Sequence, residues 1–205
     1  TITGPSLGIV SQGHIDVTIT SSDPSRVRVA PDQFTVGATS ITVTVPLGQS
    51  SVLYFLHGMP NTTGSATVTL SAPGFGEASH QVDVVPAGVE IHQLDPSMSN
   101  LSAEDADWYV QVGIPNPQGT ALQQIQVVQP GTPFIVTLSN SNPTVARLRS
   151  DEPPLIAQTV TKPIQPGIYF TISAVGDTSF GLAFDPLANG TTQVRVTGPA
   201  GMQTM

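Results

Sequence analysis

Apolar and polar residues alternate with a period of two through much of this chain. Between Ile15 and Thr20 every second residue is apolar, so the apolar side chains share one face of an extended strand. The same alternation recurs in the stretches 41–45, 66–70, 108–112, 180–184 and 194–196. No segment repeats apolar residues at helical spacing over three turns. The pattern predicts half-buried antiparallel strands and an all-β fold.

Proline and glycine separate these stretches. The chain has 19 of each, a content that long helices do not tolerate and that tight turns require. Turn signals lie between the expected strands, among them Ser22-Asp23-Pro24, Ala72-Pro73-Gly74, Asn142-Pro143 and Asn189-Gly190. Short strands at this spacing predict a sandwich or a barrel.

The sequence also repeats itself. Residues 17–29 align with residues 136–148, and two shorter matches follow in the same order, Tyr54-Phe55 with Tyr169-Phe170 and 81–84 with 193–196. Ordered matches predict two copies of one fold. We expect the joint between Val85 and Val89, which gives two domains, 1–87 and 88–205. The second copy carries additional strands at 108–112 and 122–128.

Charge excludes several classes of partner. Charged residues make up 10% of the chain and the formal net charge is -8. Nucleic-acid binding needs clustered Lys and Arg, of which the chain has 6, widely dispersed, so we expect no nucleic-acid partner.

No apolar run approaches the ~20 residues that span a bilayer, so no membrane insertion is expected. Cysteine is absent, which excludes disulfides and thiolate metal sites.

Several of these stretches resemble bacterial immunoglobulin-like (Ig-like) repeats. The likeness is carried by Ser22-Asp23-Pro24 after an alternating strand, by 36–46, by 66–75, and in the second copy by 109–116 and 183–187. The resemblance implies two tandem Ig-like antiparallel β-sandwiches from a large secreted or surface protein of a bacterium. It implies no shared catalytic residues. The stretch 150–154 departs from the pattern, since a regular turn is expected there.

Candidate chemistry is sparse. Gly4-Pro5-Ser6-Leu7-Gly8 fits the pattern of a hydrolase nucleophile elbow, but that motif needs a following helix, so Ser6 is interpreted as part of the approach to the first strand. The histidines have no partners at metal-ligand spacing. His14 is predicted to be solvated and His80 to lie at the core edge in phase with Val82. His57 is predicted to end a strand before Gly58, and His92 to lie on the polar phase of a strand at the joint. We expect no catalytic residues and no cofactor.

One aromatic pair has a defined phase. Trp108 shares its phase with Val110 and Val112 and is predicted to be buried, as a Trp often is in Ig-like sandwiches. Tyr109 then points to the opposite face, where a lone ring is a poor platform for a sugar. Three Asn-x-Ser/Thr sequons indicate surface loops, at Asn61, Asn100 and Asn189.

One acidic cluster raises the question of calcium. Glu104, Asp105 and Asp107 lie shortly after the expected joint, and Asp95 is within reach if the intervening loop folds back. Calcium prefers several such oxygen ligands, but the cluster lacks the Gly-punctuated spacing of a dedicated loop. We therefore interpret it as a solvated loop without bound metal.

Three classes of function remain open at this point. The first is a non-catalytic structural spacer, whose partners are neighbouring domains of the same polypeptide. The second is an adhesive module that binds a protein or glycan through exposed loops or aromatic residues. The third is a pair of accessory domains from a secreted enzyme. The resemblance favours an extracellular or cell-surface location, and the missing catalytic constellation favours the spacer.

Overall fold

The computed structural model describes residues 2–3, 13–99, 101, 108–131, 134–174 and 180–205, and these residues form strands and no helix. All strand pairs but one are antiparallel. The chain divides into two compact units. Unit 1 comprises Thr1–Val85 with Gln129–Gly131, and unit 2 comprises Pro86–Val128 with Thr132–Met205. The prediction of an all-β protein with antiparallel sheets is thereby confirmed.

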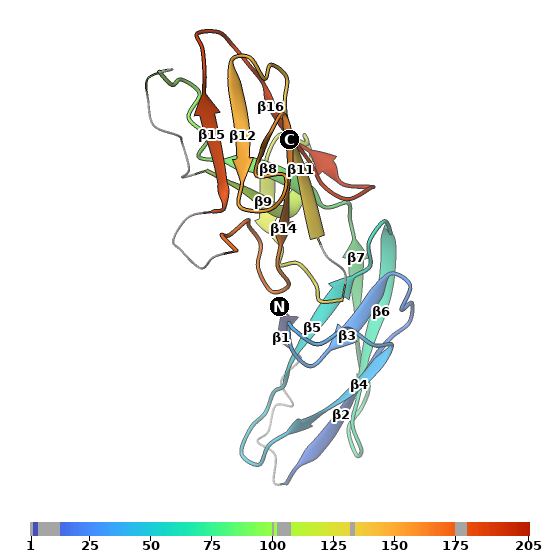
Figure 1. Cartoon of the computed structure of the whole chain (residues 1–205). Helices are drawn as coiled ribbons and strands as arrows, with labels where there is room; N and C mark the ends of the chain where they lie inside the picture. The colour runs from blue at the N-terminus through green and yellow to red at the C-terminus, as the bar shows by residue number, and fades with distance from the viewer. Residues whose placement is uncertain (1, 4–12, 100, 102–107, 132–133, 175–179) are drawn as a thin grey trace. The chain divides into compact units, whose positions relative to one another are not determined.

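Unit 1 contains two sheets (Figure 1), and side chains of both form one core. The first has the order β4-β2-β6-β7, from β4 (Ser40–Val45), β2 (Ile15–Ser21), β6 (Gly64–Ser71) and β7 (Ala78–Val84). The second has the order β1-β5-β3, from β1 (Ile2–Thr3), β5 (Leu53–Gly58) and β3 (Val27–Ala30). Side chains of both sheets form the core: Val17, Ile19, Val27, Val29, Val45, Tyr54, Ala66, Val68 and Leu70.

Unit 2 contains three sheets around one core. The first joins β10 (Leu122–Ile125), β9 (Tyr109–Pro115), β8 (Gly88–His92) and β17 (Gln203–Thr204) in that order. The second joins β14 (Thr159–Ile164), β11 (Phe134–Asn140) and β16 (Val194–Thr197). The third joins β13 (Ile156–Ala157), β12 (Ala146–Ser150) and β15 (Leu182–Pro186). Trp108 is the largest fully buried side chain among the described residues.

The two units share one strand pairing in the same register. In unit 1, β2 pairs with β4 so that Ile15 lies opposite Val45. In unit 2, β11 pairs with β14 so that Phe134 lies opposite Ile164. β2 and β11 also have the same order of exposed and buried positions along all seven residues. β2 and β11 overlap the longest of the three sequence matches.

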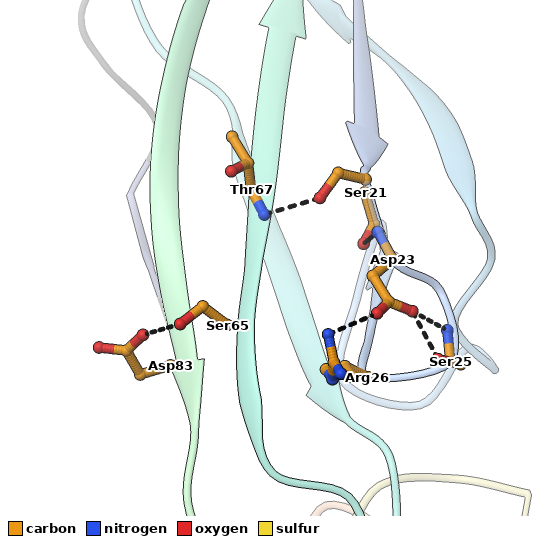
Figure 2. A network of polar contacts seen from close by, with 8 residues as sticks. Ser21, Asp23, Ser25, Arg26, Ser65, Thr67 and Asp83 are labelled. Atoms are coloured by element: carbon orange, nitrogen blue, oxygen red, sulfur yellow. Dashed lines mark hydrogen bonds and ion pairs between the residues drawn. The ribbon is translucent and has the colours of Figure 1, made fainter.

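A tight turn built on one side chain follows this strand in each unit. Asp23 Oδ1 accepts the N–H of Ser25 at 3.0 Å and its hydroxyl at 2.5 Å (Figure 2). Asn142 Oδ1 accepts the N–H of Thr144 at 3.2 Å and its hydroxyl at 2.7 Å. Asp and Asn favour such turns because their side-chain oxygens satisfy backbone N–H groups two residues ahead. In unit 1, Arg26 also donates to Asp23 Oδ2 at 2.9 Å.

The same turn forms hydrogen bonds to a neighbouring strand of the sheet and so fixes the position of that strand. The N–H of Ser22 donates to the Thr67 carbonyl at 2.9 Å, and the N–H of Thr67 donates to Ser22 Oγ at 2.9 Å. Ser141 and Gln193 exchange the same two bonds, at 3.0 and 2.9 Å. β6 of unit 1 and β16 of unit 2 therefore hold equivalent places beside the central strand.

Two of the three sequence matches are consequently wrong as structural equivalences. Residues 194–196 lie in β16, which corresponds to β6. Residues 81–84 lie in β7, which pairs with β6 on the side away from β2. There Asp83 accepts the hydroxyl of Ser65 at 2.7 Å (Figure 2). Tyr54 lies in β5, whose counterpart by pairing is β15, while Phe170 bridges to Gln111 in β9. Matches of two to four residues carry too little information to set strand order.

The strand phases predicted from alternation are largely confirmed. Trp108 and Val110 are fully buried and Val112 nearly so, while Tyr109 on the opposite face is half-buried. Several boundaries differ. The strand expected at 108–112 spans Tyr109–Pro115, the one expected at 122–128 ends at Ile125, and the one expected at 180–184 begins at Leu182. Gly181, with φ of 70°, precedes it in a backbone conformation that favours glycine.

We predict that Trp108→Ala lowers the free energy of unfolding of unit 2 by about 3–5 kcal/mol, because a fully buried ring is replaced by a cavity. Urea unfolding followed by circular dichroism measures the change. Leu101→Ala serves as the control, since Leu101 is 92% exposed and its truncation should stay within about 0.5 kcal/mol. Equal stability of the two variants would contradict the burial of Trp108.

Candidate functional site

The residues proposed from sequence are scattered. Ser6, Asn100, Glu104, Asp105 and Asp107 lie outside the described residues, so the structure does not bear on the nucleophile elbow or the acidic cluster. The other two sequons, at Asn61 and Asn189, are exposed. Asp95 is exposed, and its Oδ1 accepts the N–H of Ser97 at 2.9 Å. No group of three or more potential metal ligands occurs within the described ranges.

The histidines occupy different environments. His14 is exposed, as predicted. His80 is also exposed, and its predicted place at the core edge is wrong. β7 is an edge strand, and residues 79–81 are exposed on both faces, so the apolar phase of Val82 and Val84 does not extend to His80.

His57 is the one buried histidine among the described residues. It lies in β5 opposite Arg28, and both pack against Gly37, where an added Cβ would lie 2.7 Å from Arg28 Cβ and 3.0 Å from His57 Nδ1. Burial lowers the pKa of His57 below its ordinary value, and the nearby Asp32 carboxylate offsets part of that effect.

An aromatic cluster forms on β8 and β9 of unit 2. His92 stacks on Tyr109 with ring centroids 5.3 Å apart and planes 13° apart. Phe180 lies 4.7 Å and Phe170 lies 5.7 Å from the Tyr109 ring. All four rings are half-buried. Glu90 continues the polar side of the cluster, with its Oε2 3.2 Å from His92 Nε2 and accepting the N–H of Leu122 at 3.0 Å. Such a cluster can stack flat apolar faces of a ligand beside a carboxylate.

Sequence reasoning missed this cluster because it treated Tyr109 alone. The rings come from β8, β9 and two segments far along the chain. The bridge between Gln111 and Phe170 places one of those segments beside β9. A signal was present, since His92 and Tyr109 both lie on the polar phase of strands that pair directly.

A second candidate site, which is buried, surrounds Lys162, the only lysine of the chain. Its side chain is 1% exposed, and its ammonium donates to Oδ1 of Asp151. Asp151 Oδ2 accepts the N–H of Ala174 at 2.6 Å. Burial raises the pKa of Asp151, but hydrogen bonds from Lys162 and Ala174 and the Lys162 charge outweigh it and hold that pKa below its ordinary value. The sequence carried a signal here too, because Lys162 lies in phase with the buried Val160 and Ile164.

Comparisons with protein-family models, with curated proteins and with solved structures gave no match to this chain. The described residues contain no helix long and apolar enough to cross a membrane. The assignment of function therefore depends on the geometry of the two units.

We predict that unit 1 loses stability through His57 as the pH falls below about 6.5. Its folded pKa lies below its unfolded value, so the contribution is fully present above the unfolded pKa of about 6.5 and is lost as pH falls through the folded pKa. The carboxyl groups of Asp23, Asp32 and Asp83, whose pKa values are also lowered, lose their contributions at more acidic pH. Scanning calorimetry of His57→Gln should show a smaller decrease in Tm over this range.

His80→Gln is the matched control, because His80 is exposed in the same unit and its replacement should leave the pH dependence unchanged. If His57→Gln and His80→Gln follow the same pH profile as the parent chain, burial of a neutral imidazole does not contribute.

Proposed function

We propose that this chain is a non-catalytic structural segment, two Ig-like β-sandwiches in tandem that act as a spacer within a larger surface or secreted protein of a bacterium. Its partners are then neighbouring domains of the same polypeptide. The support comes from the strand order that the two units share and from the way unit 2 pairs its first and last strands.

The shared strand order supports the Ig-like part of the proposal. In an immunoglobulin domain strands B and E are neighbours in one sheet and C and F in the other. β2 pairs with β4 and β3 with β5, while β11 pairs with β14 and β12 with β15. The following strand departs from that domain, because β6 and β16 return to β2 and β11 and take the position of strand A. A departure that both units share supports two copies of one variant fold.

The single observation that carries the spacer proposal is the parallel pair β8 and β17. These are the first and last strands described in unit 2, with Gln203 opposite Gly88. Gln203 N–H donates to the Ala87 carbonyl at 2.9 Å, and Met205 N–H donates to the Val89 carbonyl at 3.3 Å. Tension on the two ends of unit 2 pulls these parallel strands in opposite directions. Their hydrogen bonds are then stretched together instead of opening one after another, which suits a segment that transmits force.

We predict that Gln203→Pro lowers the force at which unit 2 unfolds, since proline removes the N–H that bonds to Ala87. Pulling the chain by both ends in a single-molecule force experiment measures this, and the unfolding of unit 1 in the same traces is the internal reference. At equilibrium the lost bond is worth only about 0.5–1.5 kcal/mol.

Gln203→Ala is the matched control because it truncates the side chain and keeps the N–H. It should unfold at the parent force. Equal unfolding forces for the proline and alanine variants would show that the parallel pair does not resist tension and would remove the main support for the spacer.

The aromatic cluster favours a second candidate function, binding of a glycan. Neutral sugars present flat C–H faces that stack on aromatic rings, with polar groups at the edge to accept hydroxyl protons. Tyr109 supplies the central ring of the cluster, and Glu90 supplies a carboxylate beside it.

If the cluster binds glycans, Tyr109→Ala should abolish binding of the chain to an array of neutral oligosaccharides, because Tyr109 contacts each of the three other rings. Phe34→Ala removes a ring that is 65% exposed in unit 1 and should leave binding unchanged. A parent chain that binds no oligosaccharide on the array would rule this candidate out.

A further inference from the structure

The buried pair of Lys162 and Asp151 connects two sheets of unit 2. Asp151 directly follows β12 in the sheet β13-β12-β15, whereas Lys162 belongs to β14 in the sheet β14-β11-β16. The Lys162 side chain is 1% exposed and that of Asp151 is 17% exposed. An amine and a carboxyl group therefore contact each other where little water reaches them. These are the two groups that condense to form an amide.

The packing around the pair holds the two groups together. A Cβ on Gly181 would lie 2.5 Å from Lys162 Nζ and 2.7 and 2.8 Å from the two carboxylate oxygens of Asp151. Only glycine leaves space for the pair, and the φ of 70° at Gly181 favours glycine as well. The close approach of Gly181 and the Ala174 N–H hold the two groups against each other, which lowers the entropic cost of bringing them together.

The two oxygens of Asp151 have different partners. Oδ1 accepts from Lys162, while Oδ2 accepts the N–H of Ala174 at 2.6 Å, and the Asp151 carboxylate also accepts a side-chain hydrogen bond from Ser173. Attack of Nζ on the carboxyl carbon would place negative charge on Oδ2, where the Ala174 N–H already points. A preorganised donor of this kind stabilises the tetrahedral intermediate of acyl transfer. Oδ1 is then the oxygen that leaves.

Burial also favours the uncharged product. Two charges held in a protein interior lose much of their hydration, a loss that an uncharged amide avoids. An amide carries no net charge, and its carbonyl oxygen keeps the bond from Ala174 that Oδ2 makes now. The water released by the reaction departs from the site. Little water can return to hydrolyse the amide.

We propose that Lys162 and Asp151 form an intramolecular amide bond between Nζ and Cγ. One proton passes from Nζ to the carboxylate across their hydrogen bond, which gives a neutral amine and a carboxylic acid. The Nζ lone pair attacks Cγ, a second Nζ proton moves to Oδ1, and the Cγ–Oδ1 bond breaks. The ammonium and the carboxylate become one amide and one water, with no oxidant or reductant. This bond is independent of the spacer and glycan proposals.

Mass spectrometry of the purified, denatured full chain tests the bond directly. The expected result is a main species lighter than the sequence mass by one water. Trypsin cleaves after Arg149 and Arg195 but not before Pro163, so the tryptic peptide 150–195 contains both residues and should carry the whole loss. Its fragmentation spectrum should lack backbone fragments from within 151–162, because the amide closes that stretch into a ring.

Lys162→Met provides the variant, because it keeps an unbranched side chain of similar length and removes the amine. It should have its full sequence mass, and so should Asp151→Ala. A parent chain at its full sequence mass would overturn the proposal. A loss of one water that persists in Lys162→Met, or that maps outside 150–195 in the parent chain, would overturn it equally. The fragmentation of the parent peptide decides the matter even if neither variant folds.

Discussion

The fold depends on one burial pattern in the central strand of each unit. Along β2 the residues Val17, Ile19 and Ser21 point inward, and along β11 the inward residues are Val136, Leu138 and Asn140. Each buried aliphatic side chain contributes about 1.5–3 kcal/mol relative to an exposed one. A shift of one residue would turn the whole set to the outside, so the apolar face determines the register with both neighbouring strands.

The last inward position of each central strand is polar, and Asn140 makes side-chain bonds there that Ser21 does not. The backbone bond is common to both units, since Ser21 N–H donates to the Thr39 carbonyl and Asn140 N–H to the Gln158 carbonyl, each at 2.9 Å. Asn140 is 1% exposed, and its Nδ2 donates to the Ala146 carbonyl at 2.5 Å while its Oδ1 accepts from Thr192. A buried polar group without such partners would destabilise the turn. The turn geometry is thus shared, and the additional side-chain bonds of Asn140 are particular to unit 2.

Sequence alone predicted what depends on local periodicity. The strands around Val17, Val43, Val68 and Val110 follow from alternation, and so does the burial of Trp108. Sequence alone did not predict the pairing between distant segments, because short matches such as 81–84 with 193–196 carry no information on which strands are neighbours. β14 was not predicted as a strand because Lys162 and Pro163 interrupt its apolar pattern. The aromatic cluster escaped because His92, Tyr109, Phe170 and Phe180 belong to segments that only the fold brings together.

The position of Lys162 follows from the phase of the strand that carries it. β14 is an edge strand, and Pro163 lies opposite Ile135 in a non-hydrogen-bonded pair, so its nitrogen faces away from β11 and no ladder bond is lost. The phase of β14 is fixed by what points inward, namely Val160, Lys162 and Ile164. A slip of one residue would turn Lys162 outward, bring Thr161 and Pro163 into the core, and leave the Asp151 carboxylate without its cation. Removing one partner of a buried pair is far more destabilising than losing an exposed one. The single lysine of a charge-poor chain therefore excludes the wrong registers of this strand. An aliphatic residue at the same position would exclude them less strictly.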